Sequence, residues 1–441
     1  MDRLLLFVLL CGGLLIVSSC SDPTGVGSEL PGSGSQGTPN AREIVPDSLG
    51  SVISPSFTGQ NISPAARPGE SAPPWRFLAG AVQDPIVGTI ESEGYVDFYG
   101  QAPRDSTIVN ASPSQLNAEL RLRPTYLHGD TSAAVELALF EIRDEATMNR
   151  APADTTFEVG GQLGAVQTVA PTDSIVTFPL PDAWVQNADH LSAIQSDTTF
   201  GDDINGFKLV ATQAPSSAQR QVVMGFSHSE AALRVTTSED TVDFDALKSF
   251  SHIERRGSPE VALERRIPLV DGVGASLFME WDYSTPLFTQ QDTALNRADI
   301  AVPVDTLKMK ESLANEPSFV RPSASGYRVL ATRADDAPSC GQIGLPPSAN
   351  GDRACILPTT PSAAPGVARV TSETAFRIFE QALFETPLFT SFRVEISVQS
   401  SQDPSPETSL QTGLPSTLPV LVRTNGPVDT LPRATLILTP L

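Results

Sequence analysis

Residues 135–139, Val-Glu-Leu-Ala-Leu, place three apolar side chains on one face of an extended chain and Glu136 on the other. Because side chains alternate between the two faces of a β-strand, this pattern predicts a strand with one face in a core and one in solvent. Residues 120–123, Leu-Arg-Leu-Arg, alternate in the same way. Strands of this kind favour an antiparallel sheet, since such a sheet can have one solvated face.

Similar short runs continue along the chain, with Pro, Gly, Asp and Ser between them, at 174–178, 206–210, 220–224 and 233–236. Two segments differ. Residues 182–194 and 373–384 have apolar residues at helical spacing, and we expect short helices there. The chain is therefore predicted to be mainly β, with two tandem antiparallel β-sandwich domains of jelly-roll type, each containing a short helix.

The prediction of two domains depends on an internal repeat. Ala118-Glu119-Leu120-Arg121-Leu122 recurs as Ala298-Asp299-Ile300-Ala301-Val302. Further matches follow in the same order: 137–144 with 327–335, 206–210 with 391–396, 222–224 with 420–422, and 232–236 with 435–439. This order indicates a duplication. We expect domain 1 at residues 45–257 and domain 2 at 258–441, with the last strand, near Leu436, in the centre of its sheet.

The chain has 441 residues, enough for two domains, and a formal charge of -22. A nucleic-acid partner is excluded because the protein would approach a polyanion against its own field. Only four of the 29 basic residues are lysines, which leaves 25 arginines. Such a composition resembles that of proteins from salt-loving bacteria, and an ordinary acidic surface is the alternative.

The N-terminus predicts export. Arg3 precedes an apolar run that ends at Val17, which is typical of a signal peptide over residues 1–19. Val17-Ser18-Ser19-Cys20 looks like a bacterial lipobox, so Cys20 is the expected lipidation site and the bilayer an expected partner through its acyl chains. The alternative is a secretory signal in which this cysteine is accidental. We predict a lipid anchor in the outer membrane, followed by a flexible tether over residues 20–44.

The tether prediction rests on composition, since 12 of residues 21–40 are Gly, Ser or Pro. Beyond the signal peptide, no segment approaches the apolar length of about 20 residues that a membrane-spanning helix needs. Two cysteines remain after Cys11 and Cys20. Because an exported chain favours disulfides, we predict a bond between Cys340 and Cys355, with two free thiols as the alternative.

Several motifs resemble one family. Phe77-Leu78-Ala79-Gly80 leads to Asp84-Pro85-Ile86-Val87-Gly88, and Asn205-Gly206-Phe207, Leu269-Val270-Asp271-Gly272-Val273-Gly274 and Leu295-Asn296-Arg297-Ala298-Asp299 follow. With the lipobox, they are similar to a lipoprotein family of Bacteroidota known as domain of unknown function forty-two seventy. The resemblance covers most of residues 77–441 and implies location and architecture. It implies no catalytic residues, and Cys340 and Cys355 lie outside the family pattern.

Candidate ligand-binding residues are few. Asp202, Asp203 and Asn205 cluster their oxygens near a turn, which favours calcium as the one possible cofactor, although ordinary turn chemistry explains the same residues. Trp75, between prolines and an arginine, is a candidate for stacking on a ligand. We expect Trp184 and Trp281 to be buried.

The chain contains no recognisable catalytic motif. His128, His190, His228 and His252 are scattered, without the spacing of a zinc hydrolase. We therefore expect a non-enzymatic module that binds a protein or assembles a complex at the cell envelope. A carbohydrate-binding surface protein is the alternative, and a polysaccharide hydrolase is a third hypothesis.

Overall fold

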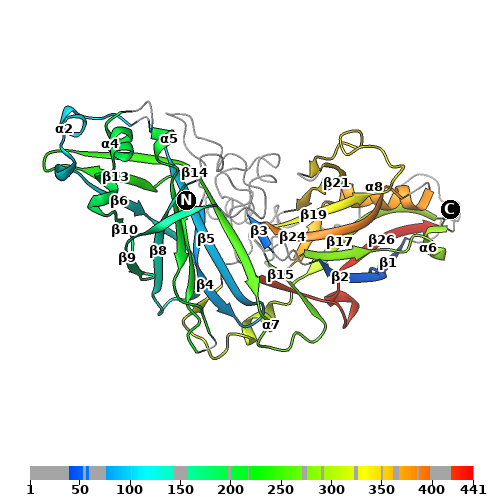
Figure 1. Cartoon of the computed structure of the whole chain (residues 1–441). Helices are drawn as coiled ribbons and strands as arrows, with labels where there is room; N and C mark the ends of the chain where they lie inside the picture. The colour runs from blue at the N-terminus through cyan, green and yellow to red at the C-terminus, as the bar shows by residue number, and fades with distance from the viewer. Residues whose placement is uncertain are drawn as a thin grey trace, which may run out of the picture.

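The computed structural model describes residues 39–52, 56–58, 76–100, 102–143, 157–196, 200–216, 218–270, 276–289, 293–321, 326–348, 351–360, 367–384, 387–397 and 419–440. The protein is mainly β, and the strands of the described residues pair antiparallel. Figure 1 shows two lobes: most of the first half of the chain lies in the left-hand lobe and most of the second half in the right-hand lobe, where the blue strands near the start of the described chain also lie. The predicted β-sandwich class is confirmed.

The N-terminal half is a sandwich of two layers. Its strands are β4 (Arg76–Asp84), β5 (Gly88–Phe98), β6 (Asn117–Leu122), β7 (Pro124–Asp130), β8 (Val135–Ile142), β9 (Val159–Val169), β10 (Val176–Pro179), β11 (Phe207–Ala211), β12 (Val222–Ser227), β13 (Ala232–Thr236) and β14 (Thr241–Arg256). The smaller layer has the order β10-β6-β13-β14, and the larger contains β7-β12-β4-β5, with β11, β8 and β9 beyond β5.

Strand β14 belongs to both layers. Its first residues, Thr241–Asp245, pair with β13, and the residues from Ala246 onward pair with β5. The register shifts between Ala246 and Lys248, as expected for a β-bulge, which bends a strand and so allows it to pass from one sheet to the next. The short strand β3 (Ser56–Thr58) pairs with the end of β14.

The strands form where the alternation predicts them. Leu120, Leu137 and Leu233 are fully buried in one apolar core between the two layers, whereas Glu119 and Arg234 lie on the outer face. The predicted helical segment at 182–194 is two short helices, α3 (Asp182–Val185) and α4 (Ala188–Gln195). Helix α4 begins after Asn187, whose side chain accepts hydrogen bonds from two backbone N–H groups of the first turn. The other short elements of this half are α2 (Ser106–Val109), η1 (Pro113–Gln115) and α5 (Phe200–Asp203).

The C-terminal half is a second sandwich with its own core. Its strands are β15 (Arg266–Val270), β16 (Ser276–Glu280), β17 (Thr293–Pro303), β18 (Phe319–Val320), β19 (Gly326–Arg333), β20 (Pro347–Ser348), β21 (Gly351–Leu357), β22 (Thr359–Thr360), β23 (Val367–Val370), β24 (Phe389–Ser397), β25 (Pro419–Arg423) and β26 (Arg433–Pro440). Its helical elements are α6 (Pro286–Thr289), α7 (Thr306–Glu311), α8 (Ser372–Phe384) and η2 (Val428–Thr430). Helix α8, predicted from the spacing of its apolar residues, buries Ile378 and Phe379 in this core.

Two strands from the start of the described chain complete the C-terminal sandwich. β1 (Asn40–Ile44) pairs with β26, and β2 (Ser48–Val52) pairs with β16. This corrects two predicted boundaries, because residues 40–44 were assigned to the tether and the following residues to domain 1. The physical reason is that backbone pairing needs no apolar pattern. The side chains of β1 are exposed except for half-buried Ile44, while the chain supplies the hydrogen bonds that the edges of β26 and β16 need.

The strand pairings follow the same order in both halves. β6 lies between β10 and β13, as β17 lies between β23 and β26. β11 lies between β5 and β8, as β24 lies between β16 and β19. The place that β14 occupies in the first half, beside β13 and then beside β5, is occupied in the second half by β1 and β2. β26 is central in its sheet, between β1 and β17, as predicted.

The two halves meet at a seam, which we define by the apolar cluster Leu78, Val82, Tyr126, Val223, Ile253, Val270, Phe319 and Leu421. The first five residues belong to the N-terminal half and the last three to the C-terminal half. In addition, β18 pairs with β7, so that a strand of the second half extends a sheet of the first. The part of the larger layer that faces the seam is therefore buried on both faces, which explains why β12 is buried along its whole length.

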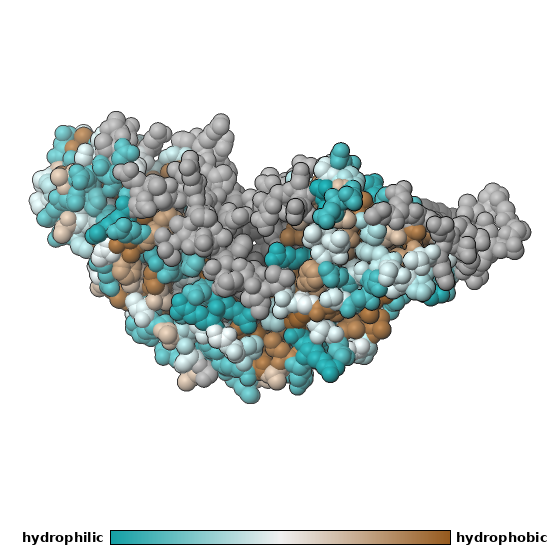
Figure 2. Space-filling model, turned by 45° about the vertical axis from the view of Figure 1, so that its right-hand side comes forward, coloured by the Kyte–Doolittle hydropathy of each residue, from teal (hydrophilic) through white to brown (hydrophobic). Residues whose placement is uncertain are grey.

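The surface is hydrophilic over much of both lobes. On the face shown in Figure 2, hydrophobic residues gather along the lower side, including where the lobes meet. Leu307 of α7 and Val320 of β18 are 62% and 42% exposed next to the seam. No helix in the described part of the chain is long and apolar enough to cross a membrane.

Candidate functional site

A groove on the outer face of the smaller N-terminal layer is the candidate binding site. Its volume is about 480 Å³, and we call it the Arg121 groove. It is lined by Arg121, Leu122, Arg123, Ser174, Ile175, Glu230, Ala231, Ala232, Asp243 and Asp245. These residues come from β6, β13 and β14 and from the segments that lead into β10 and β13.

The strand register explains why a groove forms there. Ala232 of β13 lies directly opposite Arg121 of β6 on one side and Asp245 of β14 on the other. Directly opposed residues of antiparallel strands share a face, so a small alanine separates two larger, charged side chains. With neighbouring strands about 4.8 Å apart, Arg121 and Asp245 stand about 10 Å from each other at the backbone. The alanine is the floor of the groove and the charged residues are its walls.

Further charged side chains surround the row of opposed residues Arg121, Ala232 and Asp245. Arg234 donates two hydrogen bonds of 2.7 Å to the two carboxylate oxygens of Asp243. The hydrogen bonds from Arg234 lower the pKa of Asp243; burial opposes this effect, and the charges of Arg234 and Arg121 add to it. Burial raises the pKa of Asp245, and the neighbouring Asp243 raises it further. Arg123 forms an ion pair with Glu230 at the other end of the groove.

This arrangement suits a polar ligand. Arg121 offers several N–H donors and Asp245 offers acceptor oxygens, so a molecule with both donors and acceptors can bridge them. Ser174 is the one hydroxyl side chain in the lining, and no histidine lies among the lining residues. A serine hydroxyl needs an adjacent general base to act as a nucleophile.

A second cluster lies on the outer face of the larger layer. Glu93 accepts a hydrogen bond of 2.8 Å from the Tyr95 hydroxyl and lies 2.8 Å from Lys208 Nζ. The Tyr95 ring stacks on Phe250, with ring centroids 4.4 Å apart, and Phe157 packs against both rings. Burial and the charge of Glu93 raise the pKa of Tyr95, so this hydroxyl remains a hydrogen-bond donor.

Asp97 belongs to the same face as Glu93. Burial raises the pKa of Asp97 to about 6, against the opposing effects of the Phe98 N–H and of Lys248. A raised carboxyl pKa is typical of a general acid. However, Glu93 and Asp97 are four residues apart on β5, about 13 Å along the strand. A glycosidase pair needs about 5 to 9.5 Å between its carboxyl groups, so these two residues do not form one.

The strongest buried ion pair lies at the seam. Arg321 donates to both oxygens of Asp84, from Nε at 2.6 Å and from Nη2 at 2.9 Å, and His128 Nε2 lies 3.1 Å from Asp84 Oδ2. Burial opposes ionisation of Asp84, but the hydrogen bond to His128 and the charge of Arg321 lower its pKa to about 2. Asp84 and His128 are fully buried. The cluster therefore joins the two halves from within the buried seam.

His190 and His228 also hold packed elements together. His190 lies 3.0 Å from Glu141 and holds α4 against β8. His228 is buried, and its Nδ1 lies 3.0 Å from the Ser249 hydroxyl. Burial lowers the pKa of His228 to about 4, so its ring is neutral near neutral pH.

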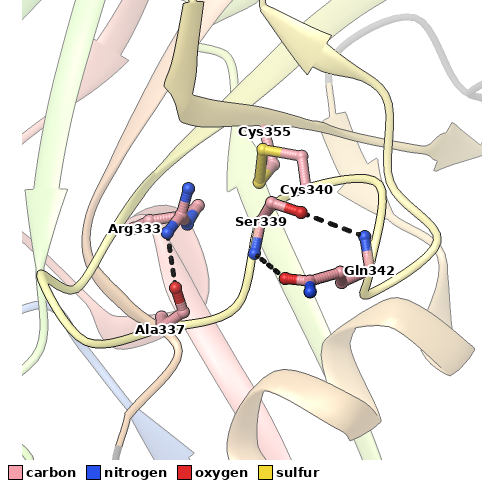
Figure 3. Close-up of a disulfide and its surroundings, with 6 residues drawn as sticks. All are labelled: Arg333, Ala337, Ser339, Cys340, Gln342 and Cys355. Atoms are coloured by element: carbon pink, nitrogen blue, oxygen red, sulfur yellow. Dashed lines mark hydrogen bonds between the residues drawn. A yellow bond between two sulfur atoms is a disulfide. The ribbon is translucent and has the colours of Figure 1, made fainter.

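The disulfide between Cys340 and Cys355 is present in the structure, as the sequence predicts (Figure 3). It closes the loop that leads to β21. Ser339 and Gln342 hold the start of this loop through hydrogen bonds between each backbone N–H and the other's side chain. A hollow of about 430 Å³ lies beside the loop, between Ile343 and Leu345 on one side and Arg377 and Ile378 of α8 on the other.

The remaining predicted site residues do not come together. Asp202 and Asp203 lie in the single turn of α5, and Asn205 follows it. No group of three or more metal-ligating His, Cys, Asp or Glu side chains occurs within the residues that the structure covers. Trp184 and Trp281 are buried, as expected. Cys20 and Trp75 lie outside the described residues.

Sequence reasoning missed the Arg121 groove. The alternation of 120–123 places Arg121 on an outer face, which is a signal in the sequence. It does not say that β13 lies beside β6, because that pairing joins residues more than 100 positions apart. No protein-family model matches this chain, and no curated protein matches it.

Proposed function

We propose that this protein is a lipid-anchored, non-catalytic module of the outer membrane that binds a partner protein or assembles a complex at the cell envelope. In this proposal, the Arg121 groove is the surface that the partner occupies. The two sandwiches, joined through the seam, are a stiff support for it.

Two features support export and anchoring. Val17-Ser18-Ser19-Cys20 has the order of residues that precedes acylation. The disulfide between Cys340 and Cys355 suits an oxidising compartment, where such bonds persist. The resemblance of residues 77–88 to a lipoprotein family implies the same location.

One observation favours binding over catalysis. Asp245 is exposed and Arg121 is half-buried at the groove, whereas His128, His190 and His228 are buried and engaged in packing. None of these three histidines lines the groove that a ligand can enter. A site of this kind recognises its ligand through hydrogen bonds and charge.

Cross-linking tests the partner. The full chain is purified from membranes after mild cross-linking, beside the double variant Arg121→Ala, Asp245→Ala. We expect an outer-membrane protein to co-purify with the natural chain and to be lost with the variant. Arg256→Ala is the matched control, because Arg256 is an exposed arginine outside the groove. Equal recovery with all three chains would reject the groove as the binding surface.

Membrane fractionation tests the anchor. Cys20→Ala should release the protein into the soluble fraction, since the acyl chains have no other attachment point in the proposal. Cys11→Ala is the matched control, because Cys11 lies within the predicted signal peptide. A Cys20→Ala variant that stays in the membrane fraction would remove the lipid anchor from the proposal.

A carbohydrate ligand is the second candidate, because carboxylate and guanidinium groups line the Arg121 groove. Sugar sites usually add an aromatic platform, and none of the lining residues is aromatic. Binding on a glycan array that the Arg121→Ala, Asp245→Ala variant loses would favour this candidate over a protein partner.

A further inference from the structure

Strand β9 has one edge that pairs with no other strand of the described residues. Among the described strands it pairs with β8 alone, although it is 11 residues long. It lies on the outer side of the left-hand lobe (Figure 1). An edge strand of this length presents a row of backbone N–H and C=O groups that another strand can pair with.

The corresponding edge of the C-terminal sandwich is covered. β21 occupies there the place of β9, next to β19 as β9 is next to β8, and its outer edge pairs with β20. β20 has only two residues, one of which is Pro347, and the disulfide holds the loop that contains it. A very short outermost strand with a proline is a common way to prevent further pairing. The two halves therefore differ in whether this edge can accept a strand.

The side chains of β9 add no charge to this edge. Its sequence, Val-Gly-Gly-Gln-Leu-Gly-Ala-Val-Gln-Thr-Val, contains no Asp, Glu, Lys or Arg, in a chain with a formal charge of -22. Gly164, with a φ of 66°, lies where the strand approaches the other layer, since a Cβ there would be 2.9 Å from the Pro179 carbonyl oxygen. The side chains of Gln162, Ala165, Val166 and Thr168 are exposed.

The unpaired, uncharged edge of β9 indicates which kind of partner it can bind. Two copies of a strongly acidic protein repel each other wherever carboxylates meet, and an uncharged strand is a place where this repulsion is smallest. An antiparallel pair of identical strands is symmetric about a twofold axis, so one edge is complementary to itself. We propose that β9 pairs with β9 of a second copy of this chain and joins the two N-terminal sandwiches into a continuous sheet.

An interface made by one strand edge is small, so the dimer is expected to be weak and concentration-dependent. Salt strengthens it. Raising the ionic strength from about 0.1 M to about 1 M shortens the screening length from about 10 Å to about 3 Å and reduces the repulsion between the two acidic bodies. This inference goes beyond the proposed function, because it involves neither the Arg121 groove nor the anchor.

Sedimentation of the full chain tests the dimer, with Cys20→Ala in every variant so that no acyl chain drives association. We expect a dimer fraction that rises with protein concentration and with salt. The double variant Gln162→Lys, Thr168→Lys places charges at two exposed positions of β9 and should raise the dissociation constant at least about tenfold, because lysines on an edge strand oppose pairing.

The control is the double variant Ser114→Lys, Gln186→Lys, at exposed positions far from β9 in the sequence. Both double variants change the formal charge from -22 to -20, so charge alone predicts equal or stronger association for both. An unchanged melting temperature shows that the variants remain folded. A single monomeric species at high salt and high concentration would overturn the proposal, as would a dimer that survives Gln162→Lys, Thr168→Lys.

Discussion

Apart from β18, which extends its larger layer, the N-terminal sandwich takes its described strands from residues 56–256, whereas the C-terminal sandwich takes two strands from the start of the described chain. In the first half, β14 follows β13 directly and closes both layers. In the second half, β1 and β2 close the same positions, although more than 380 residues separate β1 from β26. Both sandwiches therefore have a strand beside β13 or β26 and beside β5 or β16, although these strands come from different parts of the chain.

Deletion of residues 40–52 is the strongest way to break this comparison. These two strands contribute ten paired residues, and at about 0.5 to 1.5 kcal/mol per hydrogen bond their loss should destabilise the C-terminal sandwich by about 5 kcal/mol or more. Hydrogen exchange should increase in β26 and β16 and remain slow in β13 and β14. Equal protection of β26 in the deleted and natural chains would contradict the pairing.

The double variant Asn40→Thr, Arg42→Thr is the matched control for this deletion. Both side chains are exposed and the backbone pairing is retained, so stability should change by less than about 0.5 kcal/mol. A large loss in this variant would mean that the side chains of β1 matter more than its backbone.

The second prediction concerns the seam, which makes the two halves depend on each other. Arg321→Leu leaves Asp84 buried with His128 as its remaining side-chain partner, and breaking a buried ion pair in this way costs about 3 to 5 kcal/mol. Thermal unfolding should then separate into two transitions, one for each sandwich. Arg256→Leu, which removes an exposed ion pair, should cost no more than about 1 kcal/mol.

Low pH should reduce the stability that the Asp84–Arg321 ion pair gives to the seam. The pKa of Asp84 is about 2 in the folded protein, below the value of 3.8 for an unperturbed carboxyl group. The ion pair therefore contributes its full stability above about pH 4, and this contribution is lost as the pH falls toward about 2. In Arg321→Leu this acid dependence should be weaker, and an identical acid profile would show that another group is responsible.

The disulfide sharpens the comparison, because it belongs to the C-terminal half alone within the described residues. The double variant Cys340→Ser, Cys355→Ser opens a loop of about 16 residues and should lower stability by about 3 kcal/mol. The effect should be confined to the C-terminal sandwich, with β21 exchanging faster and β8 unchanged. A uniform loss of protection across both sandwiches would mean that the halves unfold as one unit.

The smallest expected effect is a gain in the stability of the N-terminal half on substitution of Asp97. Burial raises the pKa of Asp97 to about 6, so the folded protein is penalised as the pH rises from about 4 through 6 and the carboxyl group ionises. Asp97→Asn should therefore stabilise the protein by about 1 to 2 kcal/mol near pH 8 and have almost no effect near pH 4. Thermal melts at both pH values measure this, and a gain that is equal at both would exclude ionisation as its cause.

The sequence predicted those parts of the fold that depend on local patterns. Alternation located β6, β8 and β13, and helical spacing located α8. The pair Cys340 and Cys355 was predicted from composition and count. In each case the signal lies within a few residues or in one residue type.

The parts that could not be predicted depend on contacts between distant residues. Asn40–Ile44 has no apolar alternation, because its pairing with β26 uses the backbone and leaves the side chains exposed. Asp84 and Arg321 are 237 positions apart, and nothing in either neighbourhood identifies the other. The Arg121 groove likewise depends on which strands are neighbours, which a single sequence does not state.

The position of β1 beside β26 also bears on how the gene could be rearranged. Asn40 lies opposite Leu438, so the end of β26 and the start of β1 are adjacent, as in a hairpin. A circular permutant that starts at residue 258 and connects residue 440 to residue 39 through a tight turn would encode the whole C-terminal sandwich first and the N-terminal sandwich second. Each lobe could then emerge from the ribosome complete, and neither would wait for the other before closing.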